Sequence, residues 1–327
     1  MRHIPKPIQY LLLALLLLLA LFPLAGGALF GERQEFLMQQ ITYILILAIV
    51  ALSLDLLVGI TGMVSLAQAA FFGIAGYSLV LLAPEFEAVS IWVALPLCLG
   101  ISALAALLMG LLIIRTSGIF FIMVTIAFSQ MLFYLFHDAP FAGGSDGAFL
   151  TMKPSVMIGD LQLLDLENHT TLYYVVLASM VGVYLLLRTF LRAPFGKVLL
   201  GIKANEERVR ALGYNPTYYK LAVFVIAGTI AGYAGMLAAT QYGFVSPSQV
   251  GWELSAHVLV MVILGGMGNF AGAIVGAFAF EYVMHFFKDL TKHWQLLMGS
   301  FIVLVVVFAP RGLLGVVAQL SKKREAP

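Results

Sequence analysis

The sequence predicts an all-α integral membrane protein with about ten transmembrane helices, some of them short or broken. Hydrophobic residues make up 62% of the 327 residues and charged residues only 10%, whereas a soluble domain carries about 25% charged residues. Several apolar segments reach the ~20 residues that a helix needs to cross a bilayer core, and none shows the alternation of a membrane β-strand. We therefore expect one membrane domain over residues 1–327.

Ten apolar segments are predicted to span the membrane. In chain order they are 8–30, 36–59, 63–82, 91–114, 118–136, 171–190, 220–243, 252–265, 270–287 and 295–310. The first segment follows Arg2 and Lys6 and therefore also resembles a signal peptide, but its apolar run is long for one. We favour an uncleaved first helix.

Basic residues gather in alternate loops. The predicted inner side collects Arg2, Lys6, Arg115, the insertion 192–219, Arg311 and the tail 322–324. The other side collects fewer basic residues and includes the acidic loop 137–170. Because Lys and Arg are enriched in cytoplasmic loops, we expect both termini in the cytoplasm and loop 137–170 outside.

The insertion 192–219 is predicted to be a docking element. Seven of the eighteen Lys and Arg residues lie between Arg188 and Lys220, against only two acidic residues. We expect Pro194 to end the preceding helix, and a short helix then to run from residue 203 to residue 212. Val198, Leu199, Ile202, Val209 and Leu212 would form its apolar face, and Glu206, Glu207, Arg208 and Arg210 would be free to pair with another protein. The candidate coupling residues are Gly196, Lys203, Glu206, Glu207, Arg208, Leu212 and Gly213, the last as a C-terminal cap.

Two interrupted stretches rich in Gly, Ala and Ser, 59–77 and 265–280, occupy corresponding places in the two halves of the chain. Such pairs indicate a translocation path built from broken helices, although plain packing of small residues accounts for most of these glycines. The candidate path or gate residues are Ser65, Gln68, Gly266 and Gly268, together with Gly144, Ser145, Asp146 and Gly147 of an external loop motif. That motif is also typical of a simple turn with glycines at positive φ.

The sequence does not indicate a site for ATP, metal or nucleic acid. No Lys-Ser or Lys-Thr follows the glycines at 265–268, so the chain has no P-loop for ATP. The six histidines are scattered and predict no metal site, and the single cysteine, Cys98, lies in an apolar span. The net charge of +2 comes from the cytoplasmic loops and implies no binding of nucleic acid.

Few ionisable residues lie in or near the spans. We expect Asp55, Glu253, His257, Glu281 and His285 at solvated membrane boundaries, which leaves the centre nearly uncharged. A charge inside the membrane is costly and is usually kept for a function, so this pattern disfavours the alternative of an ion-coupled secondary transporter. A second alternative, a membrane enzyme, lacks any nucleophile, metal or acid–base cluster.

Six segments together carry a family resemblance. They are GITGMVSLAQAAFFGIAGY (59–77), FAGGSDGAF (141–149), FGKVLLGIKANEERVRALGYNPTYYKLAVFVIAG (195–228), SPSQV (246–250), LVMVILGGMGNFAGAIVGA (259–277) and FAPRGLLG (308–315). From about residue 40 to 318 the chain resembles the LivM-like permease subunits of ATP-binding-cassette (ABC) importers for branched-chain amino acids.

The resemblance implies a non-enzymatic permease in the bacterial inner membrane. It would work with a homologous second permease, two cytoplasmic ATPases that hydrolyse ATP and a periplasmic binding protein, and would hold no cofactor itself. The insertion 192–219 would be its coupling helix. The chain departs from the family at Ala67-Gln68, often Gly-His, at Asp55, often Asn, and at His257, often acidic. Leucine, isoleucine or valine is the expected substrate, with urea and short amides as alternatives.

Overall fold

The computed structural model describes residues 13–24, 31–84, 87–158, 161–308 and 312–315. Within these residues, seven helices are long and apolar enough to cross a membrane. Three further apolar helices are shorter, namely Leu13–Leu24, Gln68–Leu82 and Trp294–Val305. The predicted all-α membrane fold is confirmed. The ends of the first predicted span and the basic tail 322–324 lie outside the described residues.

Most helices follow one another with short connections, and the longest connection, residues 139–168, joins α5 to α6. They are α2 (Gln34–Asp55), α3 (Gln68–Leu82), α4 (Ile91–Ile113), α5 (Ile119–Asp138), α6 (His169–Arg192), α7 (Pro194–Ala204), α8 (Glu206–Ala211), α9 (Pro216–Tyr242), α10 (Trp252–Gly265), α11 (Phe270–Leu290) and α12 (Trp294–Phe308). Four short strands also occur, which the sequence analysis did not predict: β1 (Ala148–Phe149), β2 (Val156–Ile158), β3 (Leu161–Leu164) and β4 (Phe244–Val245). β1 pairs with β4 and β2 with β3, both antiparallel, so loop backbone groups are paired locally.

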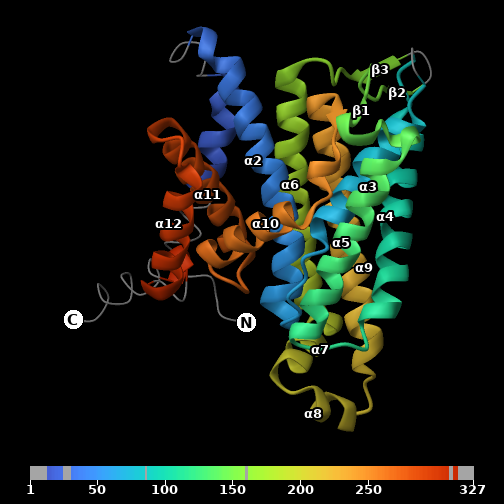
Figure 1. Cartoon of the computed structure of the whole chain (residues 1–327), viewed down its shortest axis with the longest axis vertical. Helices are drawn as coiled ribbons and strands as arrows, with labels where there is room; N and C mark the ends of the chain where they lie inside the picture. Colours follow the sequence, from blue (N-terminus) through green and yellow to red (C-terminus); the bar gives the residue numbers. More distant parts are fainter. Residues whose placement is uncertain (1–12, 25–30, 85–86, 159–160, 309–311, 316–327) are drawn as a thin grey trace.

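The helices α2, α3, α4, α5, α6 and α9 stand side by side as a bundle (Figure 1). α2 packs against α6, α9, α10 and α11, and residues 45–55 are all buried. A helix that is apolar on every side is expected in such a central position. α7 and α8 lie at one end of the bundle and the short strands at the other, while α11 and α12 flank it (Figure 1).

Asparagine side chains begin four of these helices. Asn168, Asn205, Asn215 and Asn269 each accept a hydrogen bond from a backbone N–H two or three residues later, at 2.9, 3.0, 3.1 and 3.2 Å respectively. An N-cap of this kind satisfies a donor that the helix itself leaves unpaired. These caps therefore fix where α6, α8, α9 and α11 begin.

Small residues allow neighbouring helices to approach closely. A Cβ at Gly228 or Gly232 of α9 would overlap side chains of α4, and one at Gly235 would overlap the backbone of α3. A Cβ at Gly272 or Gly276 of α11 would likewise meet the backbone of α10. Close backbone packing is a common means of associating helices in membranes, where the lipid removes the hydrophobic driving force.

Candidate functional site

The insertion 192–219 folds into two short helices, α7 and α8 (Figure 1). The single helix predicted for residues 203–212 is wrong, because Asn205 has φ −165° and ψ 106° and its side chain caps α8. An Asn side chain competes well with helical hydrogen bonding, which favours this interruption. Gly213, with φ 89°, follows α8 as predicted for a cap. Gly196 lies so close to the Leu191 backbone that a Cβ would not fit, and α7 thereby folds back tightly on α6.

The apolar face of the insertion is smaller than predicted. Leu199, Ile202 and Val209 are buried, so the two helices are anchored to the bundle and to each other. Leu212, which was also predicted to be on this face, is 75% exposed, and Tyr218 beyond it is 70% exposed. Exposed large apolar side chains beside charged ones are typical of a protein interface.

The charged residues of the insertion divide into two groups. Glu206 was predicted to be free for a partner, but it pairs with Lys220 at 2.5 Å and with Arg210 at 3.5 Å. Its role in this structure is to tie α8 to the start of α9. Glu207 and Arg208 are exposed and remain directed away from the bundle core. Among the predicted docking residues, Glu207, Arg208 and Leu212 are thus accessible and make no ion pair in the described part of the chain.

The chain is interrupted after α2, in a segment that we call the first break, residues 56–67. Leu56–Thr61 forms a π-helical turn that Gly62 ends with φ 78°, and a non-helical stretch then leads to α3. The predicted span 63–82 is therefore wrong in its first turn, because α3 begins only at Gln68. Short π-helical turns are rare and occur frequently at functional sites.

Side chains from neighbouring helices satisfy the backbone of the first break. The Leu66 N–H donates to Thr125 Oγ1 at 3.1 Å, and Ser129 Oγ donates to the Leu66 carbonyl at 2.8 Å. The Ala69 N–H donates to Ser255 Oγ at 2.8 Å. Non-helical backbone at membrane depth is tolerated only where protein or water supplies such partners. The first break is thus held by α5, and the first turn of α3, which contains Ala69, is held by α10.

Ser65 and Gln68, predicted as path or gate residues, lie inside the subunit. Both are fully buried in this structure. Ser65 Oγ accepts from the Ala67 N–H at 3.2 Å, and Gln68 Oε1 accepts from Ser53 Oγ at 3.3 Å. They stabilise the broken segment from within.

A second break, residues 266–269, separates α10 from α11 and meets the first. Gly266 and Gly268 have φ 110° and 81°, a backbone region that favours glycine. The Gly268 N–H donates to Asp55 Oδ1 at 2.7 Å, and a Cβ at Gly59 would overlap the Gly268 backbone. The two interrupted stretches singled out in the sequence are therefore in direct contact.

Two acidic residues are buried and not at solvated boundaries as predicted. Asp55 and Glu281 were expected at solvated boundaries, but Asp55 is 0% exposed and Glu281 is 4% exposed. Asp55 finds its partner in a backbone amide of the second break instead of in water. Glu253, His257 and His285, by contrast, are exposed.

The loop motif at 143–147 contains one 3-10 turn, Gly144–Asp146, and follows directly on another, Pro140–Ala142. Gly143, Gly144 and Gly147 all have positive φ, as the turn interpretation predicts. Ser145 and Asp146 are exposed, and Ser145 Oγ donates to Asp146 Oδ1 at 3.3 Å. The motif lies at the end of the bundle near the strands, apart from the two breaks.

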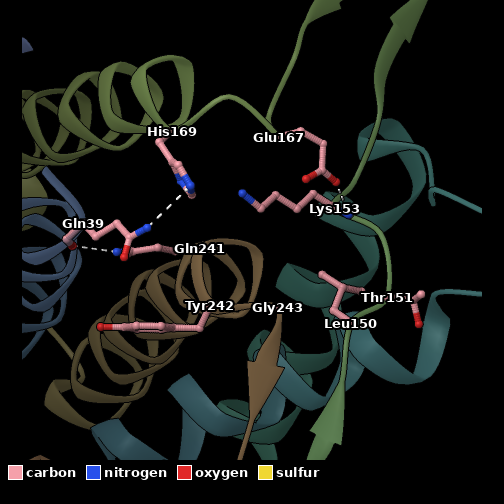
Figure 2. A pocket seen from close by; sticks show the side chains of 9 residues that line it. All are labelled: Gln39, Leu150, Thr151, Lys153, Glu167, His169, Gln241, Tyr242 and Gly243. Carbon is pink, nitrogen blue, oxygen red and sulfur yellow. Dashed lines mark hydrogen bonds between the residues drawn. The ribbon is translucent and has the colours of Figure 1, made fainter. Parts of the chain in front are cut away.

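A polar cavity of about 410 Å³ opens at this same end. Its lining residues are Gln39, Leu150, Thr151, Lys153, Glu167, His169, Gln241, Tyr242 and Gly243. In Figure 2 the Lys153 side chain extends across the cavity toward His169, and Glu167 lies above it. Glu167 Oε1 accepts a hydrogen bond from the backbone N–H of Lys153 at 3.2 Å. Among the described residues, neither the Lys153 ammonium nor the Glu167 carboxylate forms an ion pair. The cavity thus offers one charge of each sign.

Amide side chains form the opposite wall of the polar cavity. Gln241 Nε2 donates to the Gln39 carbonyl at 2.7 Å, and Gln39 Nε2 lies 3.5 Å from His169 Nε2 (Figure 2). A second cavity, of about 210 Å³, shares Tyr242 with the first. Its lining residues are Tyr43, Phe72, Ala238, Tyr242, Ser248, Gln249, Glu253, Leu254 and His257. Phe72, Ala238 and Leu254 make part of this lining apolar.

Sequence reasoning missed the polar cavity. Its residues come from positions 39, 150–169 and 241–243, and no spacing relates these three segments. The one available signal was that Lys153 and Glu167 carry opposite charges in the same predicted external loop.

Comparisons with known proteins agree on one family. Residues 36–308 match the family described as branched-chain amino acid transport system / permease component. The high-affinity branched-chain amino acid permease LivM of Salmonella typhimurium is 30% identical over 84% of this chain and 68% of its own length, and LivM of Escherichia coli K12 is 28% identical over the same shares. The xylose permease XylH of E. coli K12 is 32% identical, but only over 36% of this chain and 32% of its own.

No solved structure matches the chain. The family match covers most of the sequence, and the relatives are transport permeases, not enzymes. A bundle of apolar helices, with two breaks in contact and a polar insertion at one end, is consistent with transport across a membrane. The chain belongs to the permease components of the branched-chain amino acid transport systems, and it is a multi-pass membrane subunit of an ABC transporter.

Proposed function

We propose that this chain is the permease subunit of an ABC importer for leucine, isoleucine and valine in the bacterial inner membrane. A homologous second permease would complete the path, two cytoplasmic ATPases would supply energy, and a periplasmic binding protein would deliver the amino acid. Family membership and the names of the LivM relatives support this proposal. The fold supports it too, because the chain offers a docking surface at one end and cavities at the other.

The polar cavity is the observation that best supports an amino acid over a sugar. A free amino acid carries a carboxylate and an ammonium group, and Lys153 and Glu167 offer one partner for each. The second cavity, reached beyond Tyr242, adds Phe72 and Leu254 for an aliphatic side chain. A neutral sugar has no charge to pair with either Lys153 or Glu167.

The energy would come from ATP bound to other subunits. An ATPase pair shifts the permease between two states only if it binds the insertion differently in each state. Exposed Glu207, Arg208 and Leu212 are among the side chains available for that contact.

Uptake by the complete complex tests the substrate. The permease pair, the ATPases and the binding protein encoded with them are reconstituted in proteoliposomes and offered labelled leucine, isoleucine, valine, urea, acetamide and xylose. We expect the three branched-chain amino acids to be imported. Import of xylose, or of urea and acetamide alone, would instead assign the chain to a neutral solute.

Charge-removing variants test the polar cavity itself. We expect Lys153→Met and Glu167→Gln each to lower kcat for leucine import roughly tenfold, because each removes one charge-assisted hydrogen bond to the amino acid. Lys292→Met, which removes an exposed lysine of another predicted external loop, serves as the control. A raised KM for the loaded binding protein with an unchanged kcat would show that the cavity contacts that protein and not the amino acid.

A further inference from the structure

The insertion touches the first break through one lysine. Lys203, in the last turn of α7, donates a hydrogen bond from its ammonium group to the Gly59 carbonyl at 2.5 Å. α7 also packs directly on the π-helical turn that contains Gly59. Carbonyl groups near the end of a helix carry partial negative charge, so a cation is favourable there. The contact therefore joins a surface helix to an irregular segment of the membrane bundle.

Gly59 also contacts the second break. A Cβ at Gly59 would overlap the Asp55 carboxylate and the backbone nitrogen and Cα of Gly268. Asp55, one turn earlier, accepts the Gly268 N–H at 2.7 Å and is fully buried. Lys203, Gly59, Asp55 and Gly268 thus form one continuous set of contacts from the insertion to the place where both breaks meet.

Neighbouring charges of the insertion do not share this role. Glu206 pairs with Lys220 and Arg210, which keeps it within α8 and the start of α9. Lys197, also on α7, is exposed, and its side-chain ammonium makes no hydrogen bond or ion pair in the described residues. Lys203 is consequently the charged side chain of α7 that reaches the membrane break.

We propose that Lys203 is a positioning residue that couples movement of the insertion to the two breaks, through its hydrogen bond to Gly59 and the Gly59–Asp55–Gly268 contact. The inference rests on the proposed function, in which ATPases move the insertion. Because the backbones of Gly59 and Gly268 touch without intervening side chains, a shift of the π-helical turn reaches the second break directly. Displacing α7 moves the π-helical turn, and the turn displaces the second break.

Hydrogen exchange of the assembled complex tests the contact without reference to any substrate. We expect Lys203→Met to accelerate amide exchange in residues 56–67 roughly tenfold, the loss that corresponds to one hydrogen bond to a charged group. Lys203→Arg, which still donates, should stay close to the unsubstituted protein. The matched control, Lys197→Met, removes a positive charge from the same helix and should change nothing in this segment. Unaltered exchange in Lys203→Met, or equal acceleration in Lys197→Met, would overturn the proposal.

Two more readouts complete the test. In the unsubstituted complex, a non-hydrolysable ATP analogue should change exchange in α7 and in residues 56–67 together, and a change in α7 alone would contradict the coupling even if Lys203→Met does not assemble. In proteoliposomes, Lys203→Met should keep ATP hydrolysis but import roughly tenfold less leucine per ATP hydrolysed. If the complex imports no leucine while the exchange results hold, the substrate assignment fails and the coupling role stands.

Discussion

Asp55 shows how one buried side chain can hold two irregular segments together. Its Oδ1 atom accepts the Gly268 N–H at 2.7 Å, across 213 residues of sequence. Removing a partner from a buried hydrogen bond costs more than the bond itself contributes, because the remaining group stays desolvated. The acceptor atom of Asp55 therefore holds the second break against the end of α2. An asparagine amide offers the same acceptor without the ionisable carboxyl group.

Substitution of Asp55 separates the acceptor from the charge. We expect Asp55→Asn to keep most leucine uptake and stability, since the amide oxygen still accepts from Gly268. Asp55→Leu has no acceptor, and it should destabilise the complex by about 1–3 kcal/mol. Thermal unfolding and uptake are measured for both variants. Loss of uptake in Asp55→Asn with unaltered stability would show that the ionisable group itself takes part in transport.

The sequence predicted where the helices near Asp55 break, but not which side chains are buried or paired there. Gly59, Gly266 and Gly268 belong to stretches whose composition indicated broken helices. The burial of Asp55 was not predictable, because its partner is a backbone amide of a distant segment. The pairing of Glu206 with Lys220 was missed for a similar reason, since it depends on how α8 folds back toward α9.

At the scale of elements, backbone contact between α10 and α11 replaces side-chain packing. Gly265 and Gly272 lie so close that a Cβ on either would meet the backbone of the other helix. Backbone atoms can make such close dispersion contacts only if no side chain projects from either helix at the contact. A large side chain at this place has no room and must separate the helices.

A leucine at Gly272 tests that contact. Its Cβ would lie 2.8 Å from the carbonyl oxygens of Gly265 and Gly266, and overpacking of this kind costs about 1–3 kcal/mol. We expect Gly272→Leu to unfold at a lower temperature in detergent and to assemble poorly. Gly182→Leu on α6, where no atom lies within 4 Å of the added Cβ, is the matched control. If both variants unfold alike, the close packing of α10 and α11 does not limit stability.

The long helices and the regions of their interruptions were predictable, whereas the residues at which each helix stops and starts again were not. The prediction 91–114 agrees with α4, Ile91–Ile113, because a continuous apolar run fixes its length. The prediction 63–82 fails in its first turn because Thr125 and Ser129 hold Leu66 out of the helix. Composition does not reveal such tertiary partners. The division of the insertion at Asn205 depends on an N-cap hydrogen bond. The sequence shows that an Asn is present there but not that its side chain forms this cap.

At the scale of the whole molecule, the two ends of the bundle differ in chemistry. The insertion presents Glu207, Arg208 and Leu212 at one end, and the polar cavity presents Lys153 and Glu167 near the other. Between them, α4 and α5 expose apolar side chains that lipid or another subunit must cover. The described part of the chain has no candidate ion-coupling group exposed midway, so the energy for transport is expected from elsewhere.

The most direct test is therefore the energy source. Proteoliposomes containing this chain, its permease partner and the ATPases are supplied with loaded binding protein on the external face, and labelled leucine uptake is measured. We predict uptake that requires ATP and continues when proton and sodium gradients are collapsed at constant ATP. Uptake driven by a proton or sodium gradient without ATP, and lost in Asp55→Asn, would contradict the account and favour an ion-coupled transporter.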